Sequence, residues 1–125
     1  MKIFQSESMK KLLIVNSDPD TMQLLQDLLQ LRGYEVKYSS TREEVPSMIR
    51  SFRPDLVLLD ITQRVIIDEI SLEATRNHVP VLLMTGHNSY PEKRENEFKY
   101  FIRKPFTINE LTEKISLVRK TESVN

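Results

Sequence analysis

Five short apolar runs along this chain predict five β-strands. Four of the runs are almost continuously apolar, which is typical of parallel strands that are covered on both faces. Residues 34–38 instead alternate apolar and polar positions, so we expect this strand at an edge of the sheet. The other runs are residues 12–15, 56–60, 80–85 and 100–103.

Apolar residues at helical spacing fill the segments after the first two strands. The first helix is expected to begin with Asp18 as its N-cap and to end near Gly33, a residue that suits the position just after a helix. Thr41 and Glu44 have the spacing of a capping box and are expected to open the second helix. Pro46 lies inside that segment, so we expect the helix to start late or to bend there.

Two further helices are predicted in the second half of the chain. Ile67 and Ile70 belong to the apolar stripe of a third helix. Thr107 and Glu110 form a second capping-box pattern, which opens the last helix. Residues 89–98 are mostly charged and lack an apolar stripe, so any helix there is expected to be short, weakly docked and mobile.

Strand and helix alternate five times, and each pair of parallel strands needs a helical crossover. The predicted fold class is therefore α/β, with helices on both faces of a parallel sheet. We expect one domain over residues 10–119 and flexible tails at 1–9 and 120–125.

Composition narrows the range of functions. The chain has 125 residues, no cysteine, and 18 basic and 18 acidic residues, so its formal net charge is zero. No overall field attracts nucleic acid or an anionic membrane, and thiolate chemistry is excluded. No apolar run approaches the roughly 20 residues of a membrane span, and residues 1–11 lack a secretory signal, so a cytoplasmic location is expected.

Polar residues follow four of the predicted strands at their carboxyl ends, where open α/β sheets place their chemistry. Because Asp60 and Lys104 end two such strands, we expect this carboxylate and this ammonium group to meet. The full set is Asn16, Ser17 and Asp18, then Asp60, then Thr85, then Lys104.

Four stretches around these residues, taken together and in order, resemble the receiver domain of bacterial two-component response regulators. The resemblance spans about residues 10–119. It implies a flavodoxin-like (βα)5 three-layer sandwich with strand order 2-1-3-4-5. The stretches are LLIVNSDPD, RPDLVLLD, PVLLMTG and FIRKPF.

The resemblance also implies roles for individual residues. Asp60 matches the phosphoacceptor, and Thr85 and Lys104 match residues that contact the phosphoryl group. Phe101 matches an aromatic residue that rotates on activation, although it is equally well explained as a core residue. The bond between Lys104 and Pro105 matches one that is cis in the family.

The main departure from the family lies after the first strand. Receivers carry two acidic residues where this chain has Asn16 and Ser17, and those acids hold Mg²⁺ together with the phosphoacceptor. Mg²⁺ favours carboxylate, phosphate and water oxygens, so we expect its binding here to be weak or absent. Asp60, Asp18, Asn16 and Ser17 remain the candidate ligands, although Asp18 is better explained as an N-cap. No other cofactor is expected.

Two further segments depart from the family. The loop after Asp60, residues 61–66, lacks the family's Met-Pro-Gly-like stretch, so the third helix is expected to begin early. The shortened loop also removes a backbone carbonyl that ligates metal in the family, and Arg64 is a candidate to bring positive charge near Asp60. The segment 85–104 is shorter than the corresponding segment of the family, which predicts a remodelled output face.

Other functional classes lack their motifs. Gly33 and Gly86 are the only glycines, so the chain has no P-loop and no dinucleotide-binding fingerprint. The small number of glycines does not exclude a flavin site. His78 and His87 have no partners at metal-ligand spacing. No catalytic triad and no basic DNA-reading helix is recognisable.

Two hypotheses follow. In the first, the chain is a stand-alone atypical receiver, a protein-interaction module with impaired Mg²⁺-dependent phosphorylation. In the second, it is a working phosphoacceptor that a histidine kinase phosphorylates on Asp60, with Asp18 or phosphate oxygens holding Mg²⁺. In both, a signalling protein (the kinase or a downstream target) binds the face from Ser89 to Lys120. We expect no direct nucleic-acid or membrane partner, a monomer or weak dimer, and no enzymatic activity beyond self-phosphorylation and autodephosphorylation on Asp60.

Overall fold

The computed structural model describes residues 10–16, 19–39, 41, 43–60, 64–86 and 98–123. Five parallel strands form one sheet in the order β2-β1-β3-β4-β5, which confirms the predicted flavodoxin-like topology. The predicted fourth helix falls almost entirely on residues 87–97, outside the described part. The elements are β1 (Lys11–Asn16), α1 (Pro19–Leu31), β2 (Glu35–Ser39), α2 (Val45–Phe52), β3 (Leu56–Asp60), α3 (Arg64–Arg76), β4 (Val81–Thr85), β5 (Tyr100–Arg103) and α5 (Ile108–Ser123).

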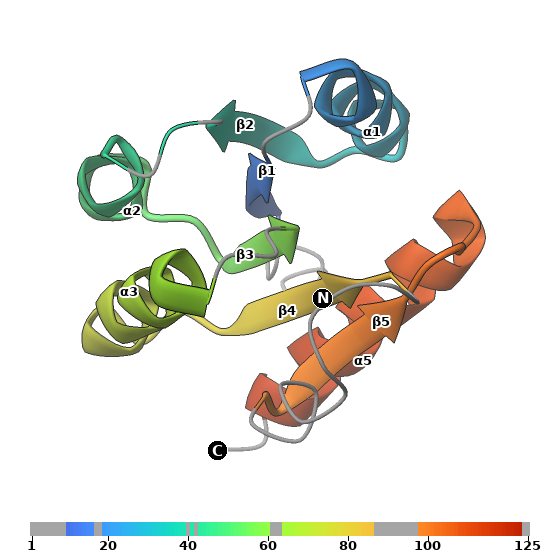
Figure 1. Cartoon of the computed structure of the whole chain (residues 1–125). Helices are drawn as coiled ribbons and strands as arrows, with labels where there is room; N and C mark the ends of the chain where they lie inside the picture. The colour runs from blue at the N-terminus through green and yellow to red at the C-terminus, as the bar shows by residue number, and fades with distance from the viewer. Residues whose placement is uncertain are drawn as a thin grey trace.

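Helices cover both faces of the sheet, with α1 and α5 on one side and α2 and α3 on the other (Figure 1). Successive residues of a central strand therefore alternate between two apolar cores. Leu12 and Ile14 belong to the core under α1 and α5, whereas Leu13 and Val15 belong to the core under α2 and α3. This double coverage explains why the central strands are continuously apolar.

The end of α1 follows the sequence-based expectation. Gly33 has φ +97°, a conformation that a residue without Cβ adopts readily. The amides of Gly33 and Tyr34 donate to the carbonyls of Gln30 and Leu29 at 3.0 and 3.2 Å, which closes the last turn. The proposed N-cap, Asp18, lies outside the described residues.

The start of α2 differs from the expectation. Its N-cap is Glu44 in a helical conformation without a side-chain capping bond, so the predicted Thr41–Glu44 capping box is wrong. The Glu44 carboxylate instead accepts a hydrogen bond from the Ser39 hydroxyl at 3.1 Å. Pro46 lies in the first turn, where its missing amide costs no helical hydrogen bond, and this confirms the predicted late start.

The second capping box is confirmed at the start of α5. The amide of Thr107 donates to Glu110 Oε1 at 2.8 Å, and the amide of Glu110 donates to Thr107 Oγ1 at 3.0 Å. Leu111, Ile115 and Val118 are fully buried, as the apolar stripe predicts.

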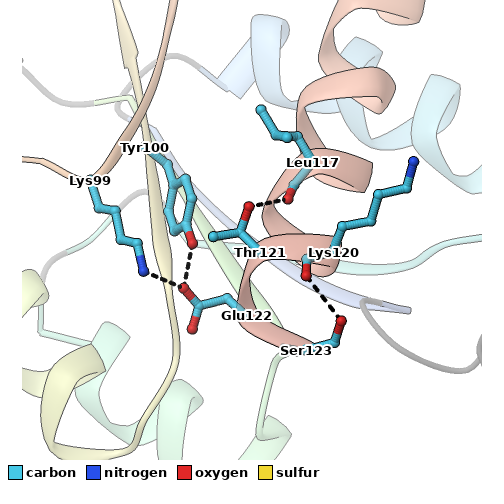
Figure 2. A network of polar contacts seen from close by, with 7 residues as sticks. All are labelled: Lys99, Tyr100, Leu117, Lys120, Thr121, Glu122 and Ser123. Atoms are coloured by element: carbon cyan, nitrogen blue, oxygen red, sulfur yellow. Dashed lines mark hydrogen bonds and ion pairs between the residues drawn. The ribbon is translucent and has the colours of Figure 1, made fainter. Parts of the chain in front are cut away.

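The far end of α5 extends beyond the predicted boundary. Instead of a flexible tail from residue 120, the helix continues to Ser123. Figure 2 shows the reason: the Glu122 carboxylate accepts hydrogen bonds from the Tyr100 hydroxyl and from Lys99 Nζ, and so ties the helix to β5. No helix in the described part of the chain is long and apolar enough to cross a membrane.

Candidate functional site

Strand register brings the predicted site residues together at the carboxyl ends of the strands. Asn16 and Asp60 are paired residues at the ends of β1 and β3. Thr85 and Arg103 are paired at the ends of β4 and β5, and Lys104 follows directly. The neighbouring predicted residues, Ser17 and Asp18, lie outside the described part of the chain.

Among the described residues, both contacts of the Asp60 carboxylate fall on the same oxygen, Oδ2. Lys104 Nζ lies 2.6 Å from Asp60 Oδ2, which confirms the predicted meeting of these two residues. The side-chain amide of Asn16 donates to the same oxygen at 3.1 Å. The Asp60 side chain is 12% exposed and that of Lys104 is 39% exposed, so solvent partly screens this ion pair.

Sequence reasoning treated Asn16 as a weak metal ligand and missed its role as a donor. Asn16 is buried, with 4% of its surface exposed. An ionised carboxylate only accepts hydrogen bonds, so the amide nitrogen of Asn16, rather than its oxygen, faces Asp60. The position of Asn16 was the available signal. Asn16 ends the strand that lies next to the one ended by Asp60, so their side chains can meet.

Thr85 and Phe101 lie on the other side of the sheet from this contact. Asn16 and Asp60 continue the alternation that faces α1 and α5, whereas Phe101 packs against the core under α2 and α3. Thr85 is buried, and its hydroxyl donates to the Ile102 carbonyl at 3.5 Å. The alternation along β4 places its side chain on the same side as Phe101.

The backbone next to Lys104 is also fixed. Its amide donates to the Thr85 carbonyl at 2.6 Å, and the bond to Pro105 is cis, as the family resemblance implies. The guanidinium carbon of Arg103 lies 5.9 Å from the centre of the Phe101 ring, within cation–π range. The β5 end therefore orients Lys104 toward Asp60 while Phe101 stays half-buried on the opposite side.

The described residues at this end of the sheet do not fit a magnesium site. Among them, no group of three or more acidic, histidine or cysteine side chains is arranged to hold a metal ion. Mg²⁺ needs several oxygen ligands in a tight octahedron. At Asp60 Oδ2 the neighbours are instead an ammonium group and an amide NH₂, which oppose a cation at that oxygen.

Comparison with known proteins identifies the family. The model of the response regulator receiver domain matches residues 12–116. The polar-differentiation response regulator DivK of Brucella anthropi is 29% identical over an alignment 118 residues long, and the match covers 85% of this chain and 93% of DivK. The transcriptional regulatory protein PrrA of Mycobacterium leprae is 30% identical over 90% of this chain, but this chain spans only 52% of PrrA.

A solved structure gives the same fold. The chemotaxis protein CheY4 of Vibrio cholerae superimposes with a TM-score of 0.72 at 22% identity, over 89% of this chain and 99% of CheY4. This chain belongs to the response regulator receiver domain family, and its class of function is two-component signal transduction. Receiver domains are in general non-enzymatic modules that interact with histidine kinases and downstream effectors.

Proposed function

We propose that this receiver works mainly as a protein-interaction module in which Mg²⁺-dependent phosphorylation of Asp60 is impaired. The observation that supports this most is the hydrogen bond from Asn16 to Asp60 Oδ2. An amide donor stands where the family has a metal-binding carboxylate. Lys104 therefore balances the negative charge of Asp60, and Asn16 adds a neutral hydrogen-bond donor where a metal ligand would be needed.

In this proposal, the family roles carry over by position. Asp60 is the phosphoacceptor position, Thr85 and Lys104 are the phosphate-contact positions, and Phe101 is the switch aromatic. The receiver-like domain spans residues 10–119, which contain the family match. An attacking carboxylate needs positive charge near the phosphoryl oxygens as charge develops there. Lys104 supplies one such charge, and the missing acids remove the means to hold a second.

The alternative is a working phosphoacceptor that a histidine kinase phosphorylates on Asp60. The retained Asp60–Lys104 pair favours it, because a 2.6 Å contact places the lysine where it would meet the phosphoryl oxygens. In this alternative, Asp18 or the phosphate itself supplies the missing oxygen ligands for Mg²⁺.

One experiment separates the two functions. Wild type and Asp60→Asn are incubated with acetyl phosphate or beryllofluoride in the presence of Mg²⁺, and the modified fraction is measured by mass spectrometry and ¹⁹F NMR. We expect no Asp60-dependent modification of wild type, and equal partner binding by the two proteins. Modification of wild type that is lost in Asp60→Asn would instead establish the phosphoacceptor.

We also propose that the partner binds the face from Ser89 to Lys120, whose described part is β5 and α5. Leu117 on α5 is 51% exposed. It borders a cavity of about 370 Å³ that Ile102, Pro105 and Phe106 also line. Such an exposed apolar residue beside a hollow suits an apolar anchor of a partner protein, and Glu113 and Lys114 line the same hollow.

A matched pair of variants tests this face. Leu117→Asp is expected to weaken binding to the cognate partner, identified from a panel of purified histidine kinases and regulators of the source organism, by about tenfold or more. Leu72→Asp is the control, because Leu72 on α3 is 52% exposed and lies outside this face. Equal loss of binding in both variants would place the interface elsewhere.

A further inference from the structure

A second cavity lies at the amino ends of the strands, the end of the sheet opposite to Asp60. It is bordered by the carboxyl ends of α2, α3 and α5. Its volume is about 440 Å³, within the range of small-molecule sites. Arg50, Arg53 and Arg119 line it together with Asp55 and Glu122. All of its lining residues belong to the described part of the chain. It therefore combines three guanidinium groups and two carboxylates in one hollow.

Three of these five charged groups already have a hydrogen-bond or ion-pair partner. Asp55 Oδ2 accepts hydrogen bonds from the amides of Lys10 and Lys11, both at 2.9 Å. Glu122 is paired with Lys99 at 3.3 Å. Arg50 is paired with Glu73 at 3.1 Å. The other two guanidinium groups, those of Arg53 and Arg119, have no such partner among the described residues.

Arg53 and Arg119 make no hydrogen bond or ion pair through their side chains with any residue that the structure describes. Arg53 also has φ +54°, a conformation that favours glycine. The other described non-glycine residue with positive φ, His78 at +59°, lines the same cavity. Both left-handed residues follow the last turn of a helix, Arg53 after α2 and His78 after α3, which brings their side chains to the border of this hollow.

Helix ends alone do not account for these arginines. Carboxyl ends of helices attract cations through their unpaired carbonyl groups. Here the amide of Arg53 closes α2 at the Ile49 carbonyl, and the amides of His78 and Val79 close α3. In α5 the Ser123 hydroxyl donates to the Lys120 carbonyl at 3.0 Å. These bonds occupy the Ile49, Ala74, Thr75 and Lys120 carbonyls, and no hydrogen bond among the described residues joins a helix-end carbonyl to the side chain of Arg53 or Arg119.

We propose that this cavity is a binding site for a small organic anion, held by Arg53 and Arg119. Guanidinium groups form paired hydrogen bonds with carboxylate or phosphate oxygens. Pro54, Val79 and Pro80 line the same cavity and offer apolar contact to the organic part of the ligand. This site is independent of the chemistry at Asp60, which lies at the carboxyl ends of the strands.

Amide NMR titrations of the whole chain test the proposal, with phenyl phosphate and benzoate as probes and phenol as the uncharged control. We expect saturable shifts at the amides of Arg53, Asn77 and Arg119 with at least one of the two anions, and none with phenol. Comparing the two anions distinguishes a phosphate site from a carboxylate site. The amide signals of Asp60 and Lys104 report separately on binding at the carboxyl ends of the strands.

Charge-removing variants provide the decisive comparison. Arg53→Gln and Arg119→Gln are each expected to weaken binding by about tenfold, since each loses a charge-assisted hydrogen bond. Arg76→Gln, an exposed arginine that does not line the cavity, should bind like wild type. The proposal is overturned if neither anion gives saturable shifts, if shifts appear only around Asp60, or if all three variants bind equally.

Discussion

The side-chain amide of Asn16 donates to Asp60 Oδ2 at 3.1 Å, across the paired ends of β1 and β3. Because Asn16 is 4% exposed, water reaches its amide poorly when the Asp60 acceptor is removed. We therefore expect Asp60→Ala to lower the free energy of unfolding by about 1–3 kcal/mol. Asp60→Asn keeps an acceptor oxygen and loses only a partly screened ion pair with Lys104, worth at most about 1 kcal/mol.

Urea denaturation of the two variants checks this difference. A larger loss in Asp60→Ala than in Asp60→Asn identifies the Asn16 bond as the main stabilising contact of Asp60. Equal losses would mean that the ion pair with Lys104 is the dominant contact.

Two identical sequence patterns are expected to behave differently on mutation. Thr107→Ala removes a formed N-cap of α5 and should lower the free energy of unfolding by about 1 kcal/mol. Thr41→Ala removes a side chain that caps nothing, so its effect should stay within about 0.5 kcal/mol. Thermal denaturation of both variants under one condition measures the difference, and similar costs would argue against the observed start of α2.

These two patterns also show where sequence prediction works. The Thr107–Glu110 box forms through two reciprocal bonds within the first turn of α5. At Thr41–Glu44, Pro46 shifts the helix start and the Ser39 hydroxyl binds the Glu44 carboxylate. The sheet was predictable throughout, because each central strand is covered on both faces and therefore carries an unbroken apolar run.

The site was predictable only in part. The meeting of Asp60 and Lys104 followed from two strand ends, which the apolar runs mark clearly. The donor role of Asn16 depends on which strand lies beside β3 and on which amide atom faces the carboxylate. The cavity of Arg53 and Arg119 depends on tertiary packing of three helix ends, and no spacing in the sequence signals it.

The left-handed conformation of Arg53 predicts that one substitution stabilises the protein. Arg53→Gly should raise the free energy of unfolding by up to about 1 kcal/mol, because glycine adopts φ +54° without the Cβ clash. The same change at Arg76, in the last turn of α3, should instead lower it by up to about 1 kcal/mol. Chemical denaturation compares the two, and destabilisation by Arg53→Gly would mean that its side chain stabilises the fold.

The contact between α5 and β5 predicts a dependence of stability on pH. The hydrogen bond from Tyr100 holds the pKa of Glu122 below its ordinary value of 4.5, and Lys99 adds to this effect. Folded Glu122 therefore releases its proton more readily than unfolded Glu122. Its contribution to stability is present above about pH 4.5 and is lost as the pH falls through the lowered pKa.

Glu122→Gln tests this linkage. The free energy of unfolding of the variant should fall less steeply than that of wild type between about pH 5 and pH 3. Glu113→Gln, an exposed glutamate of the same helix, should keep the wild-type slope. A wild-type slope in Glu122→Gln would show that the contact with Tyr100 does not stabilise the ionised carboxylate.

Asn16 and Ser17 replace the two acids that hold Mg²⁺ in the family, so we expect this site to bind Mg²⁺ poorly. The direct measurement is a Mg²⁺ titration of wild type and of the Asn16→Asp/Ser17→Asp double variant, followed through the amide signal of Asp60. If neither protein binds, the shortened loop after Asp60 is the larger defect. We expect no saturable binding by wild type at millimolar Mg²⁺ and saturable binding by the variant. Millimolar or tighter binding by wild type would show that the site still holds the metal without the two acids.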